Sequence, residues 1–281
     1  MHFQAKKIIA ASLNGTLHRY ENFFSRFIEP RNVDIWLPAD YDISNRYPVI
    51  YMHDGQNLFQ PQFSYSGIDW GIDEAITKLS ENESYKTPLI VAVWNTEKRW
   101  QEYMPEQAFE LLNKRKITQV LSQENNRSPC SDRYLKFIIT ELKPFIDKTY
   151  PILNDSNNNF IMGSSMGALV SLYALCEYPD IFRGAACLST HWIASKGIML
   201  EYLKASLPPA GKHKFYFDYG TKALDAAYHP YQLKADTILK KAGYRKGKDL
   251  LSLCFQGADH TEAAWRKRIA EPLQFLGKNL I

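Results

Sequence analysis

The chain has no long apolar segment and no recognisable leader. Its longest apolar runs, such as Pro88 to Trp94, fall well short of the roughly 20 apolar residues that a membrane-spanning helix needs. The N-terminal stretch from Met1 to Ser12 has two lysines, but no apolar core of signal-peptide length and no convincing small-residue cleavage site. We therefore expect a soluble protein that has no membrane partner and stays in the cytoplasm.

Cysteines are few, and charge of one sign is nowhere concentrated. The 4 cysteines form no Cys-x-x-Cys pair, which argues against a disulfide framework and favours reduced thiols, as in a cytoplasm. No His, Cys and Asp residues cluster at metal-ligand spacing, so we expect neither a metal nor an organic cofactor. The net charge of +4 comes from scattered lysines and arginines, so we expect no nucleic-acid partner.

A single domain is expected, because no repeat, low-complexity tract or Gly/Ser linker divides the chain. Its 281 residues, 45% of them apolar, can bury one sizeable core. The polar stretch at about 97–130 is longer than an ordinary loop, which predicts a lid-like insertion or, alternatively, a disordered surface loop. The sequence does not indicate an oligomeric state.

Strand and helix patterns alternate after an opening antiparallel pair, Leu17 to Ile28 and Asn32 to Leu37. Short apolar runs typical of strands buried on both faces are Val49 to Met52, Leu89 to Trp94, Phe160 to Met162, Ala185 to Leu188, Phe215 to Phe217 and Leu250 to Phe255. Helical patterns are Gly71 to Leu79, Ser131 to Tyr150, Met166 to Tyr178, His229 to Gly243 and Thr261 to Asn279. This alternation predicts an α/β fold whose mostly parallel sheet has helices on both faces and binds ligands at the carboxyl ends of its strands.

The motif Gly163-Ser164-Ser165-Met166-Gly167 matches G-x-S-x-G, the pattern of a nucleophilic serine on a strand-to-helix turn. Alone the match is weak, but the strand Asn159 to Met162 precedes it and an apolar helix follows it. Glycines permit a turn tight enough to raise the serine hydroxyl above the sheet edge. The context predicts an α/β-hydrolase fold with Ser165 as nucleophile; the alternative is a glycine-rich turn with an incidental serine.

His260 is the predicted base, because in this fold the base comes last in the chain, on the loop after the final strand. The oxyanion hole is expected to use the backbone N–H of Met166 and that of Gly55 or Gln56, in the loop after the third strand. An Asp-Gly turn without substrate contact is the alternative for that loop.

The acid that orients His260 should follow the preceding strand, Lys214 to Gly220. Asp225 is the first carboxylate beyond the turn, while Asp218 lies inside the end of the strand. Strand side chains point to the faces of a sheet and not to its edge, which favours Asp225. Asp218, or a Ser–His dyad without an acid, remains the alternative.

Together these residues resemble the putative-esterase family of α/β-hydrolases, which includes enterochelin (siderophore) esterases, feruloyl esterases, S-formylglutathione hydrolases and mycolyltransferases. The resemblance covers nearly the whole chain, and the motifs follow the family's order. The motifs begin at Arg31 (RNVDIWLP), Tyr51 (YMHDGQNLF), Arg99 (RWQEYMP), Gly163 (GSSMGAL), Tyr178 (YPDIF) and Asp259 (DHTEAAWR). The resemblance implies a serine hydrolase with Ser165 as nucleophile and His260 as base, and it leaves the substrate open.

Candidate substrate-binding residues lie near the same edge. Arg99 and Trp100 begin the lid-like stretch and could hold a carboxylate, catecholate or aryl group; an ion pair from Arg99 to Glu102 is the alternative. His53 follows one predicted strand, and His191 and Trp192 follow another, so these three could line the pocket.

The residues favour hydrolysis of a small-molecule carboxylic ester by a Ser-His-Asp triad through an acyl-enzyme intermediate. One alternative is an acyltransferase, because an alcohol can attack the same intermediate in place of water. A catalytically inactive binding module is a second alternative, which the presence of both nucleophile and base disfavours. No second domain for binding peptides is visible, which argues against a peptidase.

Overall fold

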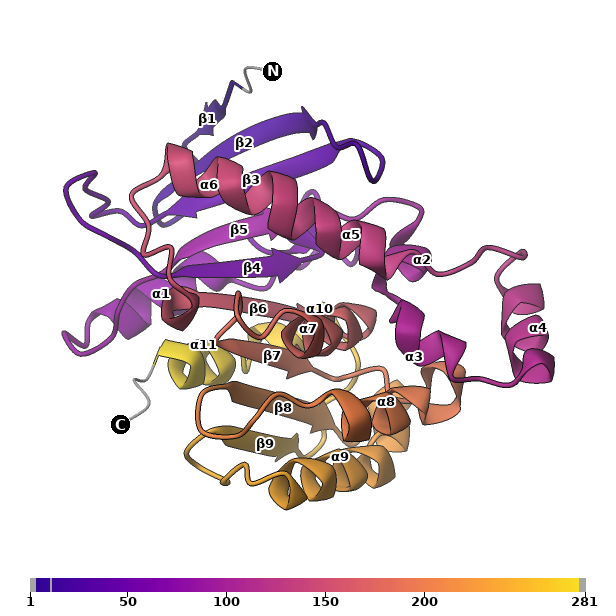
Figure 1. Ribbon diagram of the computed structural model, residues 1–281. Helices are drawn as coiled ribbons and strands as arrows, with labels where there is room; N and C mark the ends of the chain where they lie inside the picture. Colours follow the sequence, from indigo (N-terminus) through magenta and orange to yellow (C-terminus); the bar gives the residue numbers. More distant parts are fainter. Residues whose placement is uncertain (1–3, 11, 278–281) are drawn as a thin grey trace.

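The computed structural model describes residues 4–10 and 12–277, and a nine-stranded sheet runs through this part of the chain (Figure 1). The strands are β1 (Lys6–Ile8), β2 (Thr16–Phe23), β3 (Arg31–Leu37), β4 (Val49–His53), β5 (Leu89–Val93), β6 (Asn159–Ser164), β7 (Gly184–Leu188), β8 (Lys214–Gly220) and β9 (Leu250–Phe255). They lie in the order β1-β2-β3-β5-β4-β6-β7-β8-β9. The pairs β1–β2, β2–β3 and β3–β5 are antiparallel, and the remaining pairs are parallel. The predicted α/β class is confirmed.

Helices pack on both faces of the sheet. They are α1 (Ile72–Ser80), α2 (Arg99–Tyr103), α3 (Glu106–Glu110), α4 (Lys114–Gln123), α5 (Ser131–Phe137), α6 (Lys143–Thr149), α7 (Met166–Glu177), α8 (Ile198–Ser206), α9 (His229–Lys241), α10 (Glu262–Arg266) and α11 (Ala270–Gly277). Alternate side chains of β4 enter two apolar clusters, one on each face of the sheet. Val49 and Tyr51 belong to the first cluster, and Ile50 and Met52 belong to the second. The first cluster includes α5 to α9 and the second α1, α10 and α11. None of the described helices is both long and apolar enough to cross a bilayer.

Most predicted helices are present with small changes of boundary. The predicted helix from Ser131 to Tyr150 is α5, a π-helical turn (Ile138–Leu142) and α6. The predicted C-terminal helix is divided into α10 and α11, and its expected last residue, Asn279, lies outside the described residues. Strand β1, which has only three residues, and helix α8 were not predicted, although Gly197 and Pro208 mark the ends of α8.

The last strand differs from its prediction as a strand buried on both faces. Strand β9 ends the sheet, so only β8 pairs with it and most of its side chains are half-buried. Cys254 on β9 is exposed for this reason, whereas Cys176 and Cys187 lie in the core. None of the four cysteines forms a disulfide.

The polar stretch predicted as a lid forms the short helices α2, α3 and α4. Helix α2 is anchored to β3 by a buried ion pair, in which Arg31 donates to both carboxylate oxygens of Glu102 at 2.7 and 2.6 Å. Helix α3 packs on α8, and α4 buries no residue and stands away from the body in Figure 1. The stretch is therefore tied down at its start and loosely packed further along.

We expect Glu102→Gln to lower the free energy of unfolding by about 3 kcal/mol or more, because it leaves the buried Arg31 charge without its counter-ion. Both side chains are only 1% exposed, so water cannot replace the lost carboxylate. The matched control is Glu201→Gln, which breaks an exposed pair with Lys204 and should cost less than about 1 kcal/mol. Urea unfolding measures both, and equal losses would contradict the prediction.

Candidate active site

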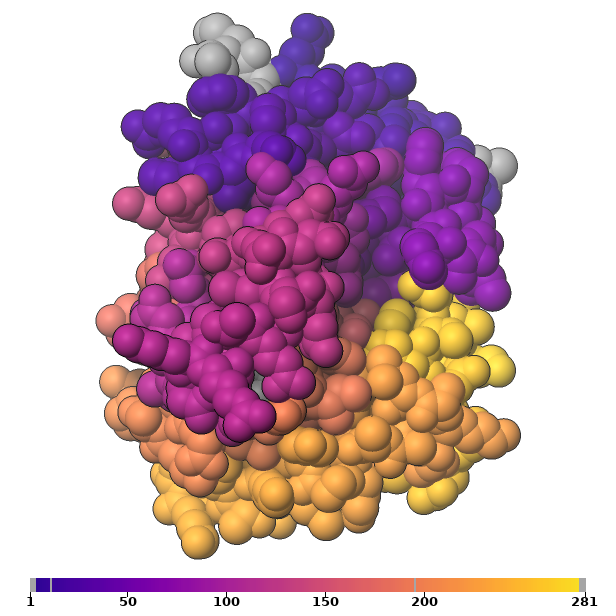
Figure 2. Space-filling view, turned by 90° about the vertical axis from the view of Figure 1, so that its right-hand side faces the viewer, coloured from indigo at the N-terminus to yellow at the C-terminus, as the bar shows by residue number. Residues whose placement is uncertain are grey.

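The parallel strands end together at one edge of the sheet. The arrows of β4, β7 and β9 point to the right in Figure 1, and Figure 2, which looks onto that side, shows the surface hollowed between the purple N-terminal part and the yellow and orange C-terminal part. A cavity of about 370 Å³ opens at this edge, where ligands bind in open α/β sheets. It is lined by Asp54, Gln56, Asn57, Tyr65, Asn95, Thr96, Arg99, Ser164, Ser165, His260, Glu262 and Trp265.

Ser165 occupies the turn between β6 and α7 with a strained backbone. Its φ of 56° and ψ of −119° are unusual for a residue with a side chain, and such strain persists only where surrounding contacts enforce it. The Ser165 N–H donates to the Leu188 carbonyl at 2.9 Å, and its own carbonyl accepts from Ala168 and Leu169 in the first turn of α7. The turn is thus fixed on both sides, as predicted for a nucleophile on a strand-to-helix turn.

The two glycines of the motif allow this turn to close. A Cβ on Gly163 would lie 2.7 Å from main-chain atoms of Gly167, closer than real Cβ atoms come. A Cβ on Gly167 would touch the Asp54 carboxylate and His53 at 3.3 and 3.4 Å. The glycines therefore serve close packing between β6, α7 and the loop after β4, and this packing keeps Ser165 in its position.

His260 connects Ser165 to Asp225 by hydrogen bonds. The Ser165 Oγ lies 2.9 Å from His260 Nε2, and His260 Nδ1 lies 2.6 Å from Asp225 Oδ1. Backbone N–H groups of Thr221 and Lys222 donate to the Ala258 carbonyl at 2.9 Å each, which ties the loop of His260 to the turn that leads to Asp225. The structure brings together the three residues that the sequence singled out as nucleophile, base and acid.

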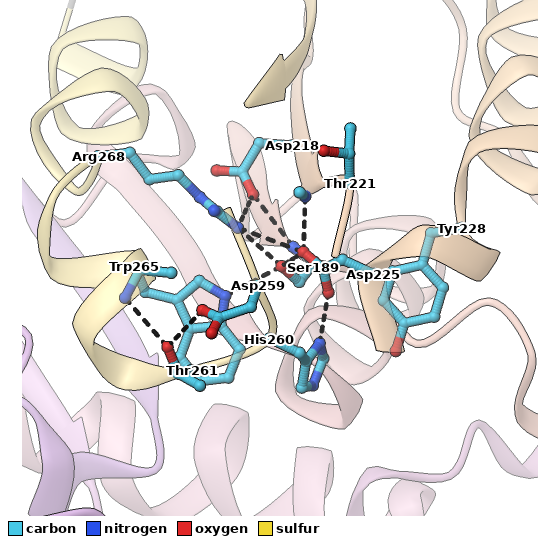
Figure 3. A network of polar contacts seen from close by, with 12 residues as sticks. Ser189, Asp218, Thr221, Asp225, Tyr228, Asp259, His260, Thr261, Trp265 and Arg268 are labelled. Atoms are coloured by element: carbon cyan, nitrogen blue, oxygen red, sulfur yellow. Dashed lines mark hydrogen bonds and ion pairs between the residues drawn. The ribbon is translucent and has the colours of Figure 1, made fainter. Parts of the chain in front are cut away.

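Asp225 is completely buried and well supplied with donors. Its Oδ2 accepts from the Gly220 N–H and from Ser189 Oγ, both at 2.6 Å (Figure 3). Burial by itself would raise the pKa of Asp225, but the hydrogen bonds with His260, Ser189 and Gly220 outweigh it and hold the pKa below its ordinary value. The carboxyl group is therefore ionised at neutral pH.

Asp218 does not point toward His260. Its Oδ1 accepts from Arg268 at 3.0 Å and its Oδ2 from Tyr216 at 2.9 Å, on one face of β8. Burial raises the pKa of Asp218, although the charge of Arg268 opposes the rise. Of the two carboxylates considered from the sequence, Asp225 is the one hydrogen-bonded to His260.

Groups suited to an oxyanion hole lie on both sides of Ser165. Met166 is the first residue of α7, so its N–H has no acceptor within the helix. Gly55 and Gln56 form a 3₁₀ turn after β4. Gln56 lines the cavity. Position 55 requires glycine, because an added Cβ would lie 2.6 Å from the Ala92 main chain.

Arg99 lines the cavity and forms a bidentate ion pair with Asp54, at 2.7 and 2.8 Å. The alternative pair between Arg99 and Glu102 is wrong, because Glu102 is occupied by Arg31. Burial would raise the pKa of Asp54, but Arg99 and the hydrogen bond from Asn95 hold it below its ordinary value. Arg99 thus combines a structural ion pair with a place at the cavity wall.

Three predicted substrate-binding residues do not reach the cavity. His53 is fully buried because Tyr103 of α2 and Tyr134 of α5 cover the end of β4, and its Nδ1 lies 2.7 Å from the Tyr134 hydroxyl. Burial lowers the pKa of His53 to about 3, so it is neutral. Trp192 is buried and donates to the Gln232 side chain, and Trp100 packs edge-on against Phe109. None of the three is among the residues that line the cavity, and their contact with substrate remains a prediction.

His191 lies beside His260 and not in the relay. The two ring centroids are 6.5 Å apart, and His191 Nδ1 lies 2.6 Å from the Tyr228 hydroxyl. Burial, together with smaller effects of the nearby His260 and Arg99, lowers the pKa of His191 to about 4. His191 is therefore a neutral neighbour of the site, and a contact with substrate remains a prediction.

Several cavity residues were not anticipated from the sequence. Glu262 stands two residues after His260, so its spacing alone could have drawn attention to it. Asn57 follows the predicted oxyanion turn directly. Tyr65 lies on a loop that carries no motif, and no sequence signal could have found it.

The family comparison decides the class of protein. A family described as "Putative esterase" matches residues 25–276. The chain belongs to the putative esterase family. The resemblance seen in its motifs is thereby confirmed, and this esterase is an enzyme that hydrolyses carboxylic esters.

Relatives of the esterase are distant. It is 22% identical over 257 residues to the uncharacterized protein YbbA of Bacillus subtilis (strain 168), covering 89% of this chain and 94% of YbbA. A solved structure of a ferulic acid esterase matches with a TM-score of 0.62 and 17% identity, covering 98% of both chains. The enterobactin and salmochelin hydrolase IroE matches with a TM-score of 0.61 and 21% identity, covering 99% of this chain and 96% of that one. These structures share the α/β-hydrolase fold of the esterase, as predicted.

Proposed function

We propose that the esterase cleaves its substrate through an acyl-enzyme, with Ser165 as nucleophile, His260 as general base and acid, and Asp225 as the residue that orients His260. The observation that carries this proposal is the hydrogen-bonded chain from Ser165 Oγ through His260 to Asp225, with contacts of 2.9 and 2.6 Å. A serine hydroxyl is a weak nucleophile at neutral pH, and a histidine at this distance can remove its proton as it attacks.

The reaction has two steps. Ser165 Oγ attacks the ester carbonyl while His260 Nε2 takes its proton, and the alcohol leaves with that proton, so that the acyl group stays on the serine. Water then attacks the acyl-enzyme and gives a proton to His260, which returns a proton to Ser165 Oγ as the acyl–serine bond breaks and the carboxylic acid leaves. Asp225 keeps its negative charge throughout and stabilises the imidazolium of His260.

Backbone N–H groups of Met166 and of Gln56 or Gly55 are the proposed donors to the tetrahedral oxyanion. Met166 lies at the N-terminus of α7, where the helix dipole favours negative charge. The cavity of about 370 Å³ suits a small-molecule ester. Most of its lining residues carry an amide, carboxylate or hydroxyl group, and the Arg99–Asp54 pair lies beside them, so polar portions of a substrate can be hydrogen-bonded there.

Ser165→Ala should lower kcat by a factor on the order of 10⁴ or more, because no acyl-enzyme can form. The variant should also lose the adduct that a fluorophosphonate probe adds to the wild-type enzyme, as seen by intact mass. Ser164→Ala is the matched control, since it changes the neighbouring serine and should still be labelled. Activity or labelling of Ser165→Ala near the wild-type level would refute the assignment.

His260→Ala should be almost as damaging to kcat as the loss of the serine, whereas His191→Ala should act mainly on KM. The physical reason is that, of these two rings, it is His260 that is hydrogen-bonded to Ser165 Oγ. Steady-state kinetics of both variants on one p-nitrophenyl ester measure the difference. Exchanged phenotypes would move the role of base to His191.

Asp225→Asn should lower kcat by roughly 10² to 10⁴ with little change in KM, because an amide can hold the wrong tautomer of His260 and cannot stabilise the imidazolium. The measurement is kcat and KM at a pH on the plateau of the pH–rate profile. A loss of less than about tenfold would indicate a Ser–His dyad that does not depend on the acid.

A further inference from the structure

A second carboxylate and a buried arginine lie directly behind Asp225. Ser189 follows β7, Asp218 lies near the end of β8, and Arg268 follows α10 (Figure 3). Ser189 and Asp218 have no exposed surface, and the Arg268 side chain is 2% exposed. Water therefore does not screen these charges from Asp225, and the contacts among them decide where the arginine charge goes.

The Arg268 guanidinium is close to three acceptors through a single nitrogen. Its Nη2 lies 2.7 Å from Ser189 Oγ, 3.0 Å from Asp218 Oδ1 and 3.7 Å from Asp225 Oδ2. Its Nε and Nη1 are buried, and no described residue accepts a hydrogen bond from either. Buried donors without an acceptor are unfavourable, so Arg268 would form a closer ion pair with Asp225 if its contacts with Ser189 and Asp218 did not hold it in place.

Ser189 is fixed between Arg268 and Asp225. Its Oγ accepts from Trp265 Nε1 at 3.0 Å and from Arg268 at 2.7 Å. Tryptophan and arginine can only donate, so the single hydroxyl proton is left for Asp225 Oδ2, 2.6 Å away. The hydroxyl thus gives Asp225 a neutral donor at the position that a guanidinium N–H would otherwise occupy.

We propose that Ser189 and Asp218 are positioning residues that hold the guanidinium of Arg268 off Asp225, so that the charge of Asp225 is kept for His260. The inference rests on the proposed function, because it assumes that His260 becomes protonated beside Asp225 during the reaction. At that point Asp218 neutralises Arg268 and Asp225 neutralises the imidazolium. Without Asp218 the imidazolium would form beside an arginine that has only Asp225 as its counter-ion, and a buried unpaired charge is costly.

The readout is the acid limb of the pH profile of kcat/KM, so the other groups around His260 must be accounted for. These are Asp225, Asp218 and Arg268 behind it, His191 and Tyr228 beside it, Asp259 before it in the chain, and Arg99 and Glu262 in the cavity wall. Burial raises the pKa of Tyr228 and lowers that of His191 to about 4. Both are therefore neutral where the limb is recorded, and Arg99 and Glu262 are unchanged in every variant below.

Asp218→Asn should move the acid limb to lower pH by roughly half a unit to one unit and lower kcat by about 10- to 100-fold, with KM nearly constant. The limb moves to lower pH because Arg268 then pairs with Asp225. The negative charge of Asp225 is then partly neutralised by Arg268 and stabilises the protonated form of His260 less. Ser189→Ala should move the limb in the same direction, since Arg268 can then close the 3.7 Å gap. If Ser189→Ala does not fold, Ser189→Gly replaces it, because the φ of 43° at this position favours glycine.

The decisive variant is the double replacement Asp218→Asn/Arg268→Gln. It removes the carboxylate together with the charge that the carboxylate restrains, so the acid limb should return to the wild-type position. If the two residues served only packing, the activity losses caused by Asp218→Asn and by Arg268→Gln would instead add in the double variant. The matched control is Ser131→Ala on α5, another fully buried serine, whose Oγ accepts from the Glu106 N–H at 2.9 Å; it should lower stability and leave the limb in place.

An unchanged limb in folded Asp218→Asn, or no return of the limb in the double variant, would overturn the inference. These outcomes are separate from failure of the proposed function, which Ser165→Ala tests by itself. If Ser165→Ala is inactive and the limb of Asp218→Asn does not move, the mechanism stands and only the role of Ser189 and Asp218 falls.

Discussion

The hydrogen bond between His260 Nδ1 and the buried carboxylate of Asp225 is the contact on which the rest of the site depends. It requires an ionised carboxylate with no exposed surface, which is unfavourable unless donors surround it. The Gly220 N–H and Ser189 Oγ provide them. These fixed donors replace water around the carboxylate. They hold Oδ2 of Asp225, while Oδ1 faces His260.

Backbone strain at Ser165 is maintained by the sheet around it. The carboxyl end of β7 accepts the Ser165 N–H, the helix α7 begins at the next residue, and glycines at 163 and 167 let both approach. His191 adds a backbone hydrogen bond to the Ser165 carbonyl at 3.2 Å. The same parallel strands that form the core therefore fix the serine hydroxyl toward His260, so that stability of the sheet and geometry of the site are linked.

Local motifs and chain order were sufficient to predict Ser165, His260 and Asp225 as neighbours, because each follows a strand of the parallel sheet at the same edge. They could not predict which strand-end side chains reach the cavity. His53 ends β4, yet α2 and α5 cover it, and no local pattern indicates how two later helices pack on a strand end. Arg268 was missed for a similar reason: its partners are 50 and 79 residues away, and only the tertiary fold brings them together.

Asp218 and Asp225 show how environment divides the roles of two identical side chains seven residues apart. Asp218 lies in β8 opposite Leu188 of β7, and its side chain shares a sheet face with Tyr216, so the strand directs it toward Arg268. Asp225 lies beyond the strand in a 3₁₀ turn, where its side chain can reach the loop of His260. Burial raises the pKa of the first, and hydrogen bonds lower that of the second below its ordinary value. The carboxylate that is easier to keep ionised is thus the one beside the histidine, and the other balances the arginine that would compete for it.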